Sequence, residues 1–266
     1  MKRFLRKIYR CLILVPHMVY WAFASYSTSR KKDPWEAIRG MCYYIHLWAK
    51  DLLRCLGVNV TVHGQIRKGE SALVVSNHLG YIDILVHASI FGLRFCPKAE
   101  IRSWPVLGHY VGMSHPIWID RSSRLKSKQN LEEFKATLEH KVPLIVYPEG
   151  TSSDGSGILP FKTSPFELAV SGNFQIQPIV TLYRVPEGEP SPCWYSDLSF
   201  MAHLWQFLGI RKIQCDVIIP DPIRANGKDR KALAQETYEV ISRIHKEYKQ
   251  KLSAEKTGPE NMEGTI

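Results

Sequence analysis

Two apolar patterns occupy the first 56 residues. The first is an apolar run from Cys11 to Ala24, which stays uncharged as far as Ser29. Fourteen strongly apolar residues are short for a helix that crosses a bilayer. The second pattern repeats at three- and four-residue spacing and predicts an amphipathic helix ended by Gly57; its members are Ile38, Met41, Ile45, Trp48, Leu52 and Cys55. We expect a helical hairpin over residues 1–56, either packed on the core or with its aromatic residues at a membrane interface, or both.

Beyond Val58, short apolar segments alternate with longer amphipathic ones. The pattern predicts strands at 58–62, 72–76, 93–96, 116–120, 142–147, 176–183 and 213–219. It predicts helices at 83–91, 103–113, 124–140, 164–172 and 229–252. Alternating strands and helices favour an α/β fold with a single largely parallel or mixed sheet flanked by helices. We therefore expect a membrane-associated helical element over 1–56, an α/β domain over 57–252 and a polar, disordered tail over 253–266.

The net charge is concentrated at the N-terminus. The chain has 35 Lys and Arg against 25 Asp and Glu, a net charge of +10, and residues 1–32 hold eight basic side chains and no acidic one. Nucleic-acid-binding proteins more often spread basic residues over a folded face, so we expect no nucleic-acid partner. Basic residues on both sides of an apolar run favour an anionic membrane surface and the cytoplasmic face of the cell (inner) membrane.

Three arrangements of residues 11–29 are compatible with this pattern. The segment can dip into one leaflet, which makes the protein monotopic, or it can cross the bilayer as a single N-terminal anchor. It can also be a cleaved signal peptide, because Ala22-Phe23-Ala24 resembles a cleavage site. The basic residues Arg30, Lys31 and Lys32 follow directly and oppose export, so we favour the first arrangement.

One of three His-x4-Asp matches lies where its side chains can meet. His46 and Asp51 fall within a predicted helix, where five residues turn about 500° and the side chains diverge. A second match, His115 with Asp120, falls on a predicted strand, where odd spacing places the two on opposite faces. Only His78 and Asp83 straddle a strand–loop–helix junction, where the chain can fold back.

An Asp that holds one imidazole nitrogen fixes the tautomer and lets the other nitrogen take a proton from a hydroxyl. The chain has no G-x-S-x-G elbow, so the activated hydroxyl would be the substrate's own. The alternative interpretation of His78 and Asp83 is a structural capping pair.

Two further clusters follow predicted strands. Residues 147–155 form a loop of small, donor-rich residues whose amides can hold an anion, with Lys162 shortly after it. Arg121 leaves the segment 116–120 and has the forked donors that bind phosphate. A polar surface turn and a solvated helix start are the plainer interpretations of these clusters.

Taken in order, these motifs resemble those of the glycerolipid acyltransferase family, specifically the 1-acyl-sn-glycerol-3-phosphate (lysophosphatidic acid) acyltransferases. The resemblance covers about residues 58–180. The matching motifs are Asn77-His78-x4-Asp83, Pro97-Lys98-Ala99-Glu100, Trp104-Pro105-x2-Gly108, Ile119-Asp120-Arg121, Tyr147-Pro148-Glu149-Gly150-Thr151 and Pro178-Ile179-Val180. Ordered motifs of this kind are much more specific than any one of them alone.

The resemblance implies an O-acyltransferase of phospholipid biosynthesis. It would move a fatty acyl group from acyl-CoA or acyl-carrier protein to the free hydroxyl of a lysolipid, in the first instance 1-acyl-sn-glycerol-3-phosphate. His78 would be the general base and Asp83 would orient it. The residues that the resemblance assigns to substrate binding are Asn77, Lys98, Arg121, Glu149, Gly150, Thr151 and Lys162.

No cofactor or metal is implied. The six cysteines are scattered without a C-x-x-C pair, which indicates reduced thiols rather than a disulfide framework or a zinc site. The expected partners are the membrane lipid surface, the lysolipid acceptor and the acyl donor.

One position departs from the family pattern, because Ser152 stands where the family usually has Arg after E-G-T. The loss of a forked cation weakens the case for a phosphate headgroup and makes a lyso-ornithine lipid or another lysolipid a plausible acceptor. Two other classes of function remain open: a lipid hydrolase in which His78 activates water, and a non-catalytic lipid-binding protein.

Overall fold

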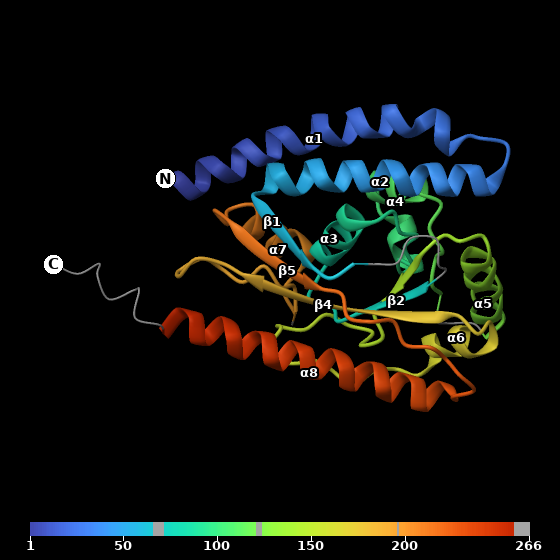
Figure 1. Ribbon diagram of the computed structural model, residues 1–266. Coiled ribbons are helices and arrows are strands. Elements are labelled where there is room, and N and C mark those ends of the chain that lie inside the picture. Colours follow the sequence, from blue (N-terminus) through green and yellow to red (C-terminus); the bar gives the residue numbers. More distant parts are fainter. Residues whose placement is uncertain (66–71, 121–123, 196, 258–266) are drawn as a thin grey trace.

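The computed structural model describes residues 1–65, 72–120, 124–195 and 197–257 (Figure 1). It begins with two helices, α1 (Lys2–Ser29) and α2 (Pro34–Leu56), which lie side by side over one face of the molecule (Figure 1). Asp33 caps α2 by accepting a 2.7 Å hydrogen bond from the Glu36 amide, and Gly57 ends the helix in the left-handed conformation. The helical hairpin predicted over residues 1–56 is confirmed.

Within the described residues, the sheet has five strands in the order β1-β5-β4-β2-β3. Their bounds are β1 (Val58–His63), β2 (Ala72–Ser76), β3 (Leu144–Val146), β4 (Gln175–Arg184) and β5 (Ile213–Ile218). Three of the four pairings are parallel, and β4 with β5 is antiparallel. The predicted single, mixed sheet flanked by helices is therefore confirmed.

Helices cover both faces of this sheet (Figure 1). They are α3 (Ile82–Ile90), α4 (Leu107–Gly112), α5 (Arg124–Glu139), α6 (Glu167–Ser171), α7 (Phe200–Phe207), α8 (Arg230–Thr257) and the 3₁₀ helices η1 (Ala99–Ser103) and η2 (Ser164–Phe166). Because side chains alternate along a strand, Val74 of β2 enters the core beneath α2 and α3, whereas Val75 enters the core that α8 covers. Both side chains are fully buried.

Several predicted elements differ from the observed ones. Segments 93–96 and 116–120 make only isolated bridges, Arg94 with Leu144 and Lys98 with Ile119. Pro97 and Pro116 lie at their ends and cannot donate to a strand ladder, which keeps both segments short. The predicted helix over 103–113 is split between η1 and α4, and α8 runs to Thr257, five residues into the predicted tail. The sequence interpretation also missed α7.

Arginine side chains fasten the N-terminal half of α1 to the α/β domain. The guanidinium of Arg10 is buried and donates to the carbonyls of Leu208 and Ile210, at 3.1 and 2.6 Å, just beyond the end of α7. Arg6 donates to the Gly209 carbonyl, and Arg3 pairs with Glu189 at 2.8 Å. These three basic residues, expected at a lipid surface, thus bind the protein itself.

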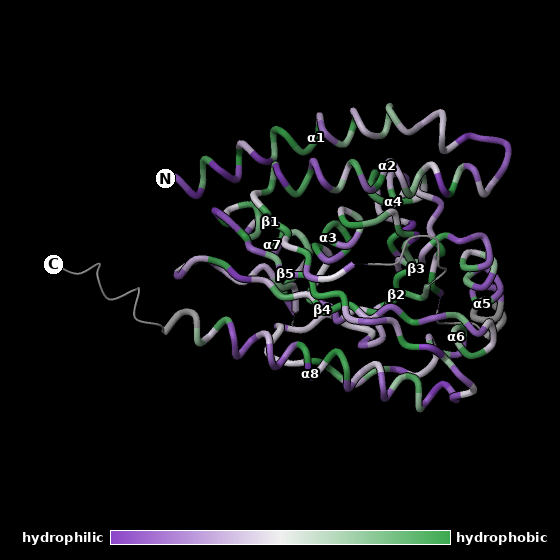
Figure 2. The backbone as a smooth tube through the Cα atoms, in the orientation of Figure 1, coloured by the Kyte–Doolittle hydropathy of each residue, from purple (hydrophilic) through white to green (hydrophobic). Residues whose placement is uncertain are grey.

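The opposite face of α1 is apolar and exposed. Its large side chains recur at three- and four-residue spacing along the whole helix; they are Leu5, Tyr9, Leu12, Val15, Val19, Phe23 and Tyr26. Figure 2 shows the polar connection between α1 and α2 beyond this apolar stretch. Among the described helices, α1 alone is long and apolar enough to cross a membrane, judged by length and composition.

Candidate active site

The turn between β2 and α3 carries the predicted His78 and Asp83. Asn77, at the end of β2, is fully buried, and its side-chain amide donates to the Thr181 carbonyl at 3.0 Å while its oxygen accepts from the Thr181 amide at 2.8 Å. This clasp continues the pairing of β2 with β4 by one residue. Gly80 has φ of 151°, and a Cβ there would lie about 3.0 Å from the backbone nitrogen of Trp194. The turn therefore needs glycine both for its conformation and for close packing.

The chain folds back at this turn as the sequence predicted. Asp83 lies in the first turn of α3, and its Oδ2 is 2.8 Å from Nδ1 of His78. The same oxygen accepts from the amides of Leu79 and Gly80, at 2.6 and 3.1 Å. The other oxygen, Oδ1, accepts a 2.8 Å hydrogen bond from the hydroxyl of Tyr183 on β4. Four donors thus hold one carboxylate that is completely buried.

These donors keep Asp83 ionised. Burial alone would raise the pKa of the Asp83 carboxyl, but the hydrogen bond from His78, the positive charge of that imidazole and the Leu79 amide outweigh it, so the pKa is lowered. Burial and the charge of Asp83 raise the pKa of Tyr183 well above its ordinary value, so its hydroxyl stays a neutral donor. Asp83 can therefore accept a hydrogen bond from the Nδ1–H group of His78 throughout the neutral range.

The arrangement leaves the other nitrogen of His78 available. With Nδ1–H donated to Asp83, Nε2 carries the lone pair. Within the described part of the chain, Nε2 has no hydrogen-bond partner, and the His78 side chain is 22% exposed. A hydroxyl group that reaches Nε2 can pass its proton to it.

The loop after β3 fixes the backbone of His78. Glu149 is buried and uses both carboxylate oxygens, one accepting from the His78 amide at 2.7 Å and the other from the Leu159 amide at 2.9 Å. Burial raises its pKa, although these two amides oppose the shift. The amide of Ser153 donates to the His78 carbonyl at 2.9 Å. Glu149 and Asn77, both expected to bind substrate, are thus engaged with the protein backbone.

The exposed side chains expected to bind substrate lie nearer the surface. Gly150 adopts φ of 72°, and the ammonium of Lys162 lies over it, where a Cβ would be. Lys98 is exposed and joins Ile119 by an isolated bridge, and Thr151 is exposed on the loop after β3. The predicted Arg121 lies outside the described residues.

Some residues of the site were missed by the sequence interpretation. Tyr183 and Thr181 come from β4, and each lies about a hundred residues from its partner in the turn. The Trp194 amide donates to the Leu79 carbonyl at 2.7 Å, and its own carbonyl accepts a hydrogen bond from the Ser152 hydroxyl. An alternating strand pattern gave no sign that Tyr183 faces Asp83, so only tertiary structure identifies it.

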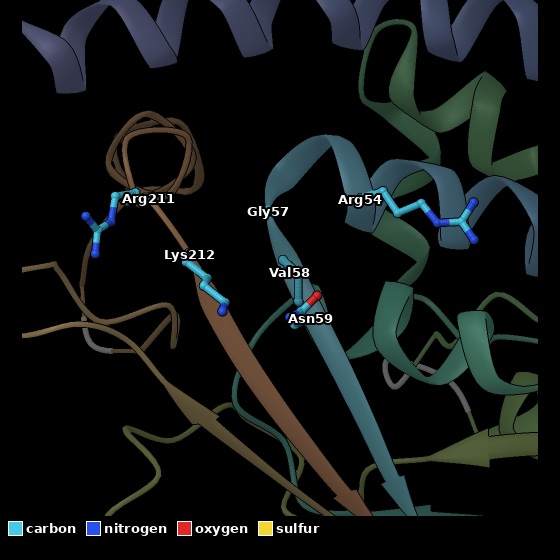
Figure 3. A pocket seen from close by; sticks show the side chains of 6 residues that line it. All are labelled: Arg54, Gly57, Val58, Asn59, Arg211 and Lys212. Atoms are coloured by element: carbon cyan, nitrogen blue, oxygen red, sulfur yellow. The ribbon is translucent and has the colours of Figure 1, made fainter.

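Two cavities lie elsewhere. One of about 490 Å³ is lined by Arg54, Gly57, Val58, Asn59, Arg211 and Lys212. Figure 3 shows the guanidinium groups of Arg54 and Arg211 pointing away from each other, so they do not converge on one anion. Another, of about 260 Å³, lies beside Cys42 and Pro143. In the parts of the chain that the structure describes, no group of three or more His, Cys, Asp or Glu side chains is placed to hold a metal ion.

The chain is similar in sequence to known acyltransferases. The family model described as "Acyltransferase" matches residues 58–182. The chain is 34% identical to a lyso-ornithine lipid O-acyltransferase of Rhodobacter capsulatus over 67% of each chain. It is 29% identical to another protein of that name from Brucella abortus, over 68% of this chain and 74% of the relative.

Other matches carry a different name. The chain is 30% identical to a 1-acyl-sn-glycerol-3-phosphate acyltransferase of Neisseria meningitidis, over 65% of this chain and 68% of the relative. The crystal structure of the 1-acyl-sn-glycerophosphate acyltransferase PlsC from Thermotoga maritima has the same fold, with a TM-score of 0.72 and 23% identity. That match covers 94% of this chain and 98% of the other.

Proposed function

Because this chain belongs to the acyltransferase family that includes lyso-ornithine lipid and 1-acyl-sn-glycerol-3-phosphate acyltransferases, we propose that it acylates the free hydroxyl of a lysolipid by direct general-base catalysis. The observation that carries the proposal is the His78–Asp83 pair. Its buried carboxylate holds Nδ1 at 2.8 Å and leaves Nε2 free on a partly exposed imidazole.

The proposed reaction proceeds in one transfer without an acyl-enzyme. Nε2 of His78 takes the proton of the acceptor hydroxyl as its oxygen bonds to the thioester carbonyl carbon of acyl-CoA or acyl-carrier protein. The carbon–sulfur bond then breaks, and the leaving thiolate takes the proton from the imidazolium. Asp83 stabilises that imidazolium and keeps the ring in the required tautomer.

For substrate binding we assign different roles to the predicted residues. Lys162, Lys98 and the Gly150–Thr151 loop are exposed and can hold an anionic headgroup. We keep Arg121 as a proposed headgroup ligand on the basis of its motif alone. Asn77 and Glu149 are better assigned to positioning, because their polar atoms are already bonded to the backbone of Thr181, His78 and Leu159.

Two observations favour a lyso-ornithine lipid over lysophosphatidate as the acceptor. At position 152 the family's usual arginine is replaced by a serine whose hydroxyl is bonded to the Trp194 carbonyl, so this position offers no cation. An ornithine headgroup has a single carboxylate, which the ammonium of Lys162 can match, whereas a phosphate monoester carries a charge of about −1.5 to −2. Relatives from Brucella abortus and Rhodobacter capsulatus bear the lyso-ornithine name.

An assay with both acceptors tests this proposal. Membranes containing the protein are given labelled acyl-CoA or acyl-carrier protein with either lysophosphatidate or lyso-ornithine lipid, and His78→Ala membranes serve as the blank. We expect esterification of the lyso-ornithine lipid above the blank, and a Ser152→Arg variant should shift product towards phosphatidate. Phosphatidate as the main product of the unaltered protein would reverse the assignment of the acceptor.

The same assay separates the other classes of function. Free fatty acid released from phospholipid, with no acyl transfer to either acceptor, would indicate a hydrolase. Equal signals from the unaltered protein and His78→Ala would indicate a lipid-binding protein without catalysis. Either result would refute acyl transfer by His78.

We further propose that α1 lies along the cytoplasmic lipid surface rather than crossing it. Arg10 fastens its N-terminal half to the end of α7, and a short connection fastens its other end to α2, so both ends of α1 stay beside the α/β domain. Cys11 and Leu14 pack against the core, which argues against a cleaved leader. The exposed apolar stripe is then the surface that enters the lipid.

Flotation of the full-length protein with anionic vesicles tests this placement. Leu12→Glu with Phe23→Glu puts two charges on the apolar stripe, whose members Leu12 and Phe23 are 69% and 87% exposed. Those substitutions should abolish flotation, whereas Ser27→Glu, at an exposed polar position of the same helix, should not. Equal flotation of the two variants would contradict the proposal.

A further inference from the structure

A stacked aromatic ring restrains the His78 imidazole perpendicular to its plane. Asp83 restrains His78 within the plane of its ring, through Nδ1. The ring of Tyr147, at the end of β3, lies against the face of that imidazole, with centroids 4.2 Å apart and planes 22° apart. A hydrogen bond to one nitrogen still permits the ring to swing about that contact, and a ring stacked on its face opposes the swing.

Tyr147 is itself held by a buried histidine. Its hydroxyl is 2.9 Å from Nδ1 of His87 on α3, and Nε2 of His87 is 2.8 Å from the Thr181 hydroxyl. His87 is completely buried. Thr181 also forms the clasp with Asn77, so the contacts run from the β2 end through β4 and α3 back to the ring that covers His78.

Tyr147 and His87 are both neutral at physiological pH. Burial lowers the pKa of His87 to about 4, although the charge of Asp83 opposes the shift. Burial raises the pKa of Tyr147 well above its ordinary value, and the charge of Asp83 adds to this. A neutral pair can orient His78 without competing with its imidazolium for the single carboxylate of Asp83.

We propose that Tyr147 and His87 are positioning residues for the reaction, Tyr147 holding the face of the His78 imidazole and His87 holding Tyr147. This rests on the proposed function, because it assigns to His78 the proton transfer. The competing interpretation is that both residues merely fill the core beneath α3. That interpretation predicts loss of folded protein, with unchanged turnover by the molecules that fold.

Substitutions at Tyr147 separate the ring from its hydroxyl. Tyr147→Phe keeps the stacked ring but loses the hydrogen bond to His87, so its kcat should fall by no more than about 5- to 10-fold, whereas Tyr147→Leu should lower kcat by about 10- to 100-fold with KM for both substrates unchanged. His87→Gln should lower kcat by a smaller factor, on the order of 5- to 10-fold. Unchanged kcat in folded Tyr147→Leu would overturn the proposal, and so would a loss confined to KM.

A chemical measurement keeps the test independent of turnover. Diethyl pyrocarbonate modifies neutral imidazoles, and peptide mass spectrometry can follow each histidine separately. Tyr147→Leu should speed modification of His78 at least about threefold, since one face of the ring is uncovered, while Tyr147→Phe should not. His140, whose ring stacks on Trp35 at 3.8 Å, is the internal reference.

These two readouts distinguish the possible failures. Faster modification of His78 in Tyr147→Leu, with no acyl transfer by the unaltered protein or any variant, would refute the proposed function. It would still support the conclusion that Tyr147 covers the His78 ring. An unchanged rate of modification, with active enzyme, would refute the positioning role alone. If Tyr147→Leu does not fold, the rate of His78 modification and the kcat measured in His87→Gln decide between the same outcomes.

Discussion

The described part of the molecule contains two histidine–aspartate pairs, which look alike in composition but differ in their surroundings. In one, His78 Nδ1 is 2.8 Å from Asp83. In the other, His63 of β1 places Nε2 3.3 Å from Asp216 of β5. Each Asp is buried, and each pair has a tyrosine within hydrogen-bonding distance.

The partners of each pair decide what it can do. Asp216 also receives two hydrogen bonds from the Arg184 guanidinium, at 3.1 and 2.6 Å, and the Tyr248 hydroxyl lies 2.7 Å from the same His63 nitrogen. An arginine thus neutralises that carboxylate, and the phenol shares with Asp216 a single nitrogen of the His63 imidazole. Asp83 has neutral donors besides His78, so its charge remains available to an imidazolium. A His–Asp contact therefore indicates a general base only when no other cation neutralises the carboxylate.

Amide substitutions at the two aspartates give the largest expected difference. Asp83→Asn should lower kcat by about 10²–10⁴-fold, because the amide no longer selects the tautomer or stabilises the imidazolium. Asp216→Asn should leave kcat within about twofold and cost about 1 kcal/mol of stability, since Arg184 is partly exposed and loses a charged partner. Acylation rates and urea unfolding measure both effects. A similar loss of kcat in the two variants would remove the distinction between the pairs.

The fold was predictable wherever burial has a simple period. The apolar stripe from Ile38 to Cys55 and the alternation of apolar residues from Val58 correctly predicted the positions of α2 and β1. Segments 93–96 and 116–120 have strand-like composition, but Pro97 lacks an amide donor and the pairing between the two segments amounts to an isolated bridge with a few backbone hydrogen bonds. The short helix α7 gave too few turns for a clear period, although Ser199 caps it by accepting from the Ala202 amide.

The site was predictable only where its contacts are local. His78 and Asp83 lie five positions apart, so the junction of strand and helix sufficed to predict that they meet. Tyr183 and Trp194 reach the same turn from distant parts of the chain, and no local pattern encodes that approach. The role of Glu149 depends on the burial of its carboxylate, which the motif does not reveal.

The buried His87 should make the stability of the folded protein depend on pH. The pKa of His87 is about 4 in the folded protein against 6.5 ordinarily, so between these values only the unfolded chain takes up its proton. Protonation of His87 in the unfolded chain therefore costs the folded protein nothing above pH 6.5. As the pH falls from 6.5 towards 4, the free energy of unfolding decreases by about 3 kcal/mol for this reason.

His87→Gln removes this titration and provides the matched comparison. Between pH 7 and pH 4.5, the unaltered protein should lose about 2–3 kcal/mol more stability than His87→Gln, because only the former leaves an uncharged imidazole buried. Urea unfolding followed by tryptophan fluorescence gives both values. Parallel losses in the two proteins would mean that His87 is protonated or hydrated in the folded state.

The two tyrosines give the smallest expected contrast. Tyr183→Phe removes the hydroxyl that donates to Oδ1 of Asp83, and the backbone amides of Leu79 and Gly80 remain on the other oxygen. A hydrogen bond to a buried charge contributes about 1.5–3 kcal/mol, and we expect part of it to appear as a fall in kcat of about 10-fold. The remainder should appear as lower stability.

Tyr248→Phe is the control, because it removes a tyrosine hydroxyl from the His63 pair, there from the imidazole rather than from the carboxylate. It should leave kcat unchanged while Tyr183→Phe lowers it, with KM for the acceptor constant in both. If Tyr183→Phe also leaves kcat unchanged, the two amides and His78 alone hold Asp83 in place. The distinction between the pairs would then rest on Arg184, since a cation neutralises Asp216 whereas the remaining donors to Asp83, apart from His78, are neutral amides.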